Sequence, residues 1–118
     1  MLLGFKRRFA PHIEAGRKTH TIRGKRKRPP RVGEICHCYV DPRQRTMRLL
    51  GRWPCIKVEH IEISADHEVE INGVRLSVRQ RESLARRDGF TSFAEMMQFW
   101  KGRLPFTGDI IHWEWSPS

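Results

Sequence analysis

Apolar and polar residues alternate over several short stretches, and this period of two predicts a chain built mainly of β-strands. The stretches that we expect to form strands are residues 2–9, 17–23, 35–40, 45–50, 56–63 and 106–115. Gly51 and Pro54 mark a bend or bulge between two of these strands. Residues 68–76 alternate on both sides of Asn72-Gly73, the preferred two-residue turn, and therefore predict a β-hairpin.

Helical signals are fewer and shorter. Residues 11–15 begin with a proline and predict a helix of about one turn, which Gly16 ends by adopting a left-handed conformation. Residues 77–87 predict a second helix, whose first residue is a serine that can act as its N-cap. A capping-box pattern at Ser92 opens a third helix, which we expect to reach Trp100.

A chain of 118 residues without an internal repeat suits one domain, residues 1–118, of the α+β class. The expected architecture is a small mixed β-barrel of about five to six strands with about two to three short helices. Three cysteines and no secretory leader indicate a reduced, cytoplasmic protein with free thiols. No apolar stretch approaches the ~18 residues of a membrane span. Cys36-His37-Cys38 lacks the spacing of a zinc knuckle, so we expect no metal site. We also expect no other cofactor, and we favour a monomer.

Positive charge is concentrated in one segment. The chain has 23 Lys and Arg against 13 Asp and Glu, and eight of the basic residues lie between residues 17 and 31, which contain no acid. Residues 24–31 have no apolar side chain except two prolines, so we expect an exposed basic loop there. RNA or a nucleotide is the expected partner of such a segment, and a merely solvated loop is the alternative. The cations expected to contact phosphates are Lys25, Arg26, Lys27 and Arg28.

Lys18 is the first candidate for chemistry. Neighbouring cations such as Arg17 and Arg23 disfavour its ammonium form, and partial burial would act in the same direction. A lowered pKa would make Lys18 available as a base near neutral pH. Thr21 carries a hydroxyl that such a base can activate as a nucleophile. On a regular strand, however, residues 18 and 21 point to opposite faces, so the two can meet only if the chain turns or bulges after Gly16. The alternatives are a solvated lysine and a threonine that simply favours a strand.

Three further residues have both a functional and a structural interpretation. Asp88 ends the second predicted helix, where the helix dipole disfavours a carboxylate, so it is either compensated by neighbouring arginines, a turn former before Gly89, or functional. Arg23 can clamp a phosphate or carboxylate, or pair with an acid inside the fold. His20 is of the residue type best suited to acid–base work near neutral pH.

These residues fall in a recognisable pattern. Gly16-x-Lys18-x-x-x-x-Arg23 resembles the signature of the ASCH domain, a small β-barrel similar to the PUA domain. The resemblance continues in the same order along nearly the whole chain, through Val32-Gly33-Glu34, Ala85-x-x-Asp88-Gly89-Phe90 and Gly108-Asp109-Ile110-Ile111. It implies a PUA-like fold and a function on RNA or nucleoside derivatives.

One branch of small bacterial members consists of amidohydrolases that remove the acetyl group from N4-acetylcytidine. Their threonine nucleophile, the lysine that activates it and their glutamate correspond by resemblance to Thr21, Lys18 and Asp88. The sequence departs from this branch in two ways. Asp88 is one methylene shorter than glutamate, and the basic loop is unlike the segment expected there and indicates a larger, phosphate-bearing ligand.

Two other functions are compatible with the same residues. A non-catalytic RNA-binding module would use the basic loop together with Arg17, His20 and Arg23 to contact phosphates. A metal-independent ribonuclease would use Lys18, His20 and Arg23 for acid–base work and for phosphate stabilisation.

Overall fold

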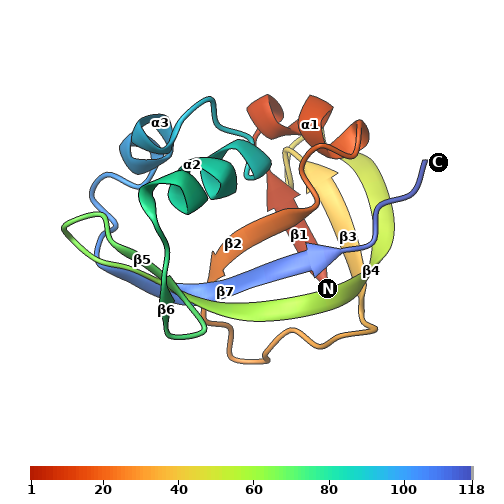
Figure 1. Cartoon of the computed structure of the whole chain (residues 1–118). Helices are drawn as coiled ribbons and strands as arrows, with labels where there is room; N and C mark the ends of the chain where they lie inside the picture. Colours follow the sequence, from red (N-terminus) through yellow and green to blue (C-terminus); the bar gives the residue numbers. More distant parts are fainter. Residues whose placement is uncertain (118) are drawn as a thin grey trace.

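The computed structural model of the chain describes residues 1–117, which form an α+β fold with a mixed, strongly curved sheet and helices gathered at one end (Figure 1). The strands are β1 (Leu2–Phe5), β2 (His20–Gly24), β3 (Ile35–Val40), β4 (Arg48–Ile63), β5 (Val69–Ile71), β6 (Val74–Arg75) and β7 (Phe106–Trp113). The helices are the 3-10 helix η1 (Arg7–Phe9) and the α-helices α1 (Ala10–Glu14), α2 (Val78–Arg87) and α3 (Phe93–Phe99).

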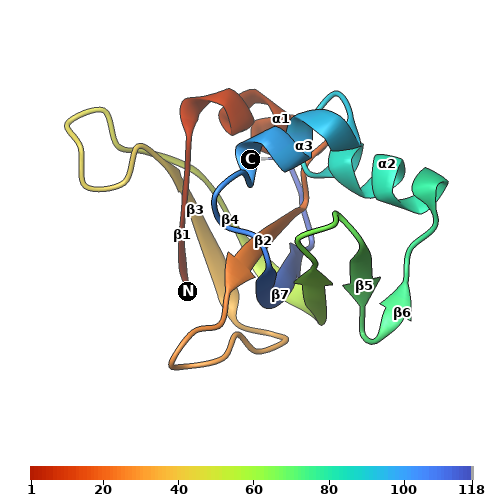
Figure 2. The same ribbon diagram turned by 90° about the vertical axis from the view of Figure 1, so that its left-hand side faces the viewer.

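The long strand β4 organises the sheet. Its first half pairs with β3, and its second half pairs with β7 and β5, all antiparallel. Strand β1 runs parallel to β3, and β2 runs antiparallel to β7. The two groups of strands curl toward one another, but β1 and β2 do not pair, so the sheet does not close (Figure 2). The expected small α+β, PUA-like fold is therefore confirmed, and its barrel is open along the seam between β1 and β2.

The irregular middle of the chain was only partly foreseen by its pattern. Instead of two strands separated by a bend, β4 is one strand of 16 residues, and residues 45–47 lie outside it. In place of a bend, β4 has two shifts of register. One lies opposite Cys38 and Tyr39 in its pairing with β3, and the other lies between Cys55 and Lys57 in its pairing with β7. These irregularities let a single strand serve both halves of the sheet.

Most other boundaries agree with the pattern. Strand β3 and the hairpin of β5 and β6 are confirmed, and Asn72 and Gly73 have the positive φ angles, 50° and 80°, that the tight turn requires. The first strand was predicted too long, because the chain after Phe5 turns into η1 and carries Phe9 into the core. Gly24 belongs to β2 and not to the loop that follows it.

The core is one continuous apolar cluster in which the sheet packs against the helices. Trp53 and Trp113 stack with ring centroids 6.2 Å apart, and Phe5 meets Trp113 edge-on at 6.0 Å. All three cysteines are buried and free. Along residues 1–117, none of the helices has the length and apolar content needed to cross a membrane.

Candidate functional site

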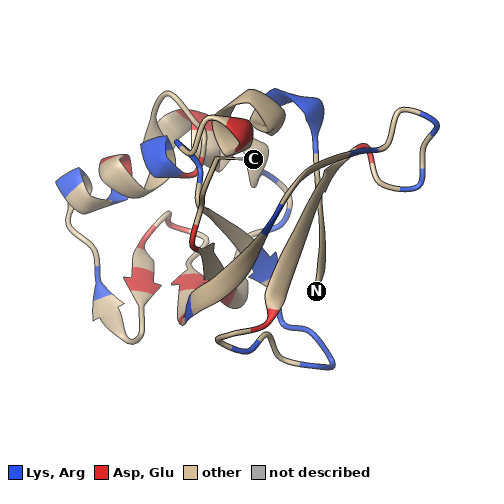
Figure 3. Ribbon diagram, turned by 90° about the vertical axis from the view of Figure 1, so that its right-hand side faces the viewer, with Lys and Arg blue, Asp and Glu red and all other residues tan. Residues whose placement is uncertain are grey.

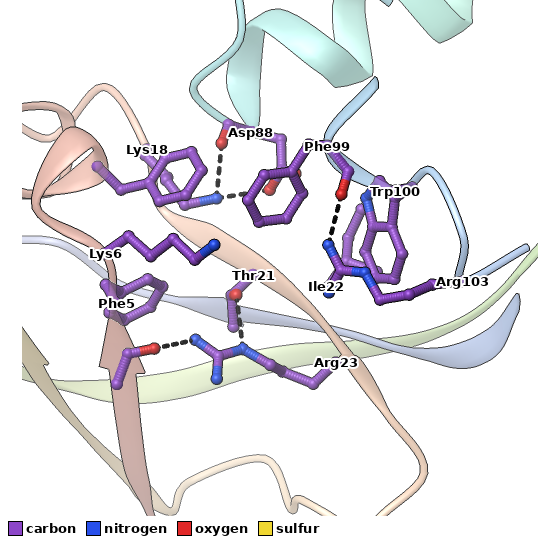
Figure 4. A pocket seen from close by; sticks show the side chains of 12 residues that line it. Phe5, Lys6, Lys18, Thr21, Ile22, Arg23, Asp88, Phe99, Trp100 and Arg103 are labelled. Carbon is purple, nitrogen blue, oxygen red and sulfur yellow. Dashed lines mark hydrogen bonds and ion pairs between the residues drawn. The ribbon is translucent and has the colours of Figure 1, made fainter. Parts of the chain in front are cut away.

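The open seam between β1 and β2 contains a cavity of about 210 Å³. Gly4 and Phe5 line it from β1, and Thr21, Ile22 and Arg23 line it from β2. The helical layer closes the cavity above with Phe9, Asp88, Phe99 and Trp100, and Lys6, Lys18 and Arg103 complete the lining (Figure 4). The cavity thus holds all three residues that the sequence indicated for catalysis.

The end of α1 brings Lys18 to this cavity. Gly16 has a φ angle of +74°, and the amides of Arg17 and Lys18 both donate to the carbonyl oxygen of His12, at 2.9 and 3.0 Å. A Cβ atom on residue 16 would lie 2.7 Å from the Trp115 ring, so only glycine fits this close turn. Strand β2 begins only at His20, so Lys18 precedes it and the strand alternation that would separate residues 18 and 21 does not apply.

Lys18 contacts Asp88 at the end of α2. Lys18 Nζ donates to Asp88 Oδ1 at 2.5 Å and to the Asp88 carbonyl oxygen at 2.7 Å. Asp88 is the C-cap of α2, where backbone carbonyl oxygens lack helical partners and the helix dipole favours a cation. Lys18 therefore compensates both the side-chain carboxylate and the helix end, and the shorter aspartate does reach its lysine.

A third ionisable group shares the same carboxylate. His20 Nε2 lies 3.1 Å from Asp88 Oδ1, an ion-pair distance, although the geometry falls short of a hydrogen bond. On its other side, the His20 ring lies 5.4 Å from the ring of His112, which in turn contacts Glu59 Oε1 through Nε2 at 2.7 Å. Lys18 and His20 therefore both contact the Asp88 carboxylate, and the His20 ring packs beside its cross-strand partner His112.

Burial controls the protonation of this cluster, because the side chains of Lys18, His20 and Asp88 are 3%, 3% and 8% exposed. Burial lowers the pKa of Lys18 below its ordinary value, and the Asp88 carboxylate only partly offsets the shift. Burial also lowers the pKa of His20, with Asp88 acting in the opposite sense. For Asp88, burial raises the pKa, but the nearby Lys18 and His20 outweigh it and hold the pKa below its ordinary value. The carboxylate thus stays ionised while the lysine is more easily deprotonated.

Thr21 points into the cavity from β2, with Arg23 beside it on the same face of the strand. Arg23 Nε donates to Thr21 Oγ1 at 3.0 Å, and Arg23 Nη2 donates across the seam to the carbonyl oxygen of Gly4 at 2.6 Å. Arg23 therefore forms hydrogen bonds with a hydroxyl and with a backbone carbonyl oxygen, and within residues 1–117 it does not pair with an acidic side chain. Lys18 and Thr21 line the same cavity without a direct hydrogen bond between them, which leaves room for a ligand group.

The other residues that the sequence indicated lie elsewhere. His20 is buried on the face of β2 opposite to Thr21, and Arg17 is exposed beside α1, where its Nε lies 3.5 Å from His12 Nδ1. Neither residue lines the cavity. Lys25, Arg26, Lys27 and Arg28 lie in the loop from β2 to β3, at the end of the molecule away from the helices (Figure 3), and none of them lines the cavity.

The sequence pattern did not indicate some of the residues that line the cavity. Lys6, Phe99 and Arg103 reach the cavity from the end of β1 and from the segment around the end of α3. No local spacing links these positions to Lys18, since the open seam and the packing of α3 bring them together. The described residues contain no group of three or more His, Cys, Asp or Glu side chains suited to a metal ion.

Comparisons with known proteins agree with this architecture. No protein-family model matches the chain, and no curated protein sequence matches it either. Among solved structures, two crystal structures of mutants of ZmASCH from Zymomonas mobilis match with a TM-score of 0.58 and 14% sequence identity. The match covers 98% of this chain and 69% and 68% of the two ZmASCH chains. The chain therefore has the ASCH fold that its sequence resemblance predicted, with its cavity in the open seam.

Proposed function

We propose that this protein is an amidohydrolase acting on N4-acetylcytidine-type substrates, with Thr21 as nucleophile, Lys18 as base and Asp88 as the residue that orients Lys18. The observation that supports it best is the meeting of these three side chains in one cavity, with Lys18 and Asp88 almost completely buried. The aromatic side chains of Phe5, Phe99 and Trp100 give the same cavity apolar walls that suit a nucleobase.

The two contacts with Asp88 prepare Lys18 for the role of base. A neutral amine has two N–H groups, and here both have an acceptor, Asp88 Oδ1 and the Asp88 carbonyl oxygen. The lone pair of the nitrogen is then left for a proton from the cavity. The lowered pKa of Lys18, caused by burial, makes this neutral form accessible.

The reaction then proceeds in two steps. Thr21 Oγ1 attacks the acetyl carbonyl carbon and gives its proton to Lys18. The C–N4 bond breaks, Lys18 returns the proton to the leaving N4 amine, and cytidine departs from an acetyl ester on Thr21. Water that loses a proton to Lys18 attacks this ester, and acetate leaves as Thr21 regains a proton. The Arg23 Nε–H group, 3.0 Å from Thr21 Oγ1, stabilises the charge on this oxygen as its proton leaves.

Incubation of the purified protein with N4-acetylcytidine tests this proposal, with cytidine and acetate measured by chromatography. Thr21→Val removes the nucleophile, and Lys18→Met removes the base, which we expect to reduce kcat by about 10²–10⁴-fold. Thr19→Val is the matched control, since Thr19 lies two residues away and does not line the cavity. If the acetyl-enzyme intermediate is trapped, mass spectrometry should detect an added acetyl group at Thr21. Absence of cytidine at high concentrations of folded enzyme, or full activity of Thr21→Val, would refute the proposal.

The basic loop supports a second candidate, an RNA-binding module without catalysis. Lys27, Arg28 and Arg31 are exposed, and among residues 1–117 none of them has a carboxylate within ion-pair distance. Binding to RNA is then expected to weaken steeply with salt and to fall when residues 25–28 are neutralised together. Affinity that does not change with ionic strength would contradict it. The ribonuclease alternative is less well supported, because His20 is buried and outside the cavity.

A further inference from the structure

The cavity carries an excess of positive charge, and the exposed side chains of Lys6 and Arg103 form its mouth. Its lining includes four cations, Lys6, Lys18, Arg23 and Arg103, but only one carboxylate, that of Asp88. Asp88 is already engaged by Lys18. Among the described residues, no acidic side chain lies within ion-pair distance of Lys6, Arg23 or Arg103.

This lack of acids contrasts with the rest of the surface. Several exposed arginines do have carboxylate partners: Arg7 pairs with Asp41 at 2.6 Å and Arg48 with Glu14 at 2.8 Å. Acidic residues are therefore available in this fold, but the mouth of the cavity excludes them. A site that keeps three cations without a counter-charge is suited to an anionic ligand.

Two of these cations are held in place by Phe99. Lys6 Nζ lies 5.0 Å from the centroid of the Phe99 ring, and Arg103 Cζ lies 4.8 Å from the same centroid. Arg103 Nη2 also donates to the Phe99 carbonyl oxygen at 2.6 Å, and its guanidinium lies 4.5 Å from the Trp100 ring centroid. In Figure 4 the ends of Lys6 and Arg103 point toward one another across the mouth, above Thr21.

We infer that the mouth binds a phosphate group, so that the substrate is a nucleotide, either free or within RNA, and not a nucleoside. The inference rests on the proposed function for the identity of the base. The cavity of about 210 Å³ is smaller than the roughly 300–1,000 Å³ of typical ligand sites, so it admits the acylated base and leaves the sugar phosphate outside. There Lys6 and Arg103 meet the phosphate, with Arg103 offering its planar pair of donors.

The test compares kcat/KM for N4-acetylcytidine, its 5′-monophosphate and a short RNA containing one N4-acetylcytidine. We expect a phosphate-bearing substrate to exceed the nucleoside by about tenfold or more at low salt, as for a charge-assisted hydrogen bond. This ratio should fall toward one in Lys6→Gln and in Arg103→Gln. It should persist in Lys101→Gln, which removes an equal charge just after α3 without touching the cavity.

A binding measurement separates this inference from the proposed function. Calorimetric titration with cytidine and with cytidine 5′-monophosphate needs no turnover, so a preference for the monophosphate that depends on Lys6 and Arg103 supports the mouth even if no amide is hydrolysed. In the kinetic comparison, a higher kcat/KM for the RNA alone assigns the site to a phosphodiester, and a higher kcat/KM that the monophosphate shares assigns it to a nucleotide. Equal affinity for cytidine and every phosphate-bearing ligand, or an equal loss in Lys101→Gln, overturns the inference.

Discussion

Replacing Asp88 by asparagine removes one half of the buried pair with almost no change in shape. At 2.5 Å and an effective dielectric constant of about 20, the attraction between Lys18 Nζ and Asp88 Oδ1 is roughly 7 kcal/mol before desolvation is considered. Removing one partner of such a buried pair costs about 3–5 kcal/mol. We expect the lower end, about 3 kcal/mol, because Lys18 can release its proton when the carboxylate is lost.

The assay is urea unfolding followed by tryptophan fluorescence and circular dichroism. A loss of about 3 kcal/mol is a large part of the roughly 5–15 kcal/mol that a domain of this size has in total. Lys18→Met and the double variant complete a cycle, in which the double variant should be less destabilised than the sum of the single ones by about 2 kcal/mol or more. Glu14→Gln, which breaks the exposed pair with Arg48, should cost about 0–1 kcal/mol. Additive effects at residues 18 and 88 would refute the reasoning.

The same variant has a defined pH dependence. Burial lowers the pKa of Lys18, so the unfolded chain binds this proton more tightly and the free energy of unfolding rises with pH up to the ordinary value of 10.5. Asp88 opposes that shift, so its loss lowers the pKa of Lys18 further and widens the window toward neutral pH. The destabilisation by Asp88→Asn should therefore be smaller at pH 9.5 than at pH 7. A constant or growing difference would show that Lys18 does not lose its proton.

Three further predictions concern other parts of the site and core. Gly16→Ala should destabilise the fold by at least about 1–2 kcal/mol in urea unfolding, because its φ angle is +74° and the Trp115 ring leaves no room for a Cβ atom. His20→Gln should lose less stability than the wild type between pH 7 and pH 5, since burial lowers the pKa of His20 and its protonation in the unfolded chain favours unfolding at acidic pH. The buried thiols should stay unmodified by iodoacetamide at pH 8 until urea unfolds the chain, because burial raises the pKa to about 12 for Cys36 and Cys38.

The elements that the sequence predicted best are those with local causes. The hairpin at Asn72 and Gly73 depends on two positive φ angles, and the start of α2 depends on a capping box between Ser77 and Gln80. Both signals lie within a few residues of one another. The single strand β4 was missed because its continuity depends on different partners along its two halves. Such pairing is a property of the whole sheet, which a local pattern does not contain.

The residues of the candidate site also divide into those that local sequence indicated and those that only the fold brings together. Lys18 and Thr21 were indicated by a motif within eight residues, and Asp88 by its anomalous place at a helix end. The sequence could not show that Lys18 precedes β2, since that depends on the turn at Gly16 being fixed by contacts with His12 and Trp115. Nor could it show Lys6 and Arg103, which lie almost one hundred residues apart in the chain and both contact the Phe99 ring.

The buried charges of Lys18 and Asp88 lie beside the open seam of the sheet. The edges of β1 and β2 lack strand partners across the seam, and Arg23 spans the gap with a bond from β2 to the Gly4 carbonyl oxygen in β1. A continuous apolar core could fill such a seam, and replacing a buried ion pair by apolar side chains is often neutral or stabilising. Stability alone therefore does not account for Lys18 and Asp88. The amidohydrolase activity that we propose does account for them, because burial lowers the pKa of Lys18, as a base requires, while the Asp88 carboxylate keeps the amine oriented.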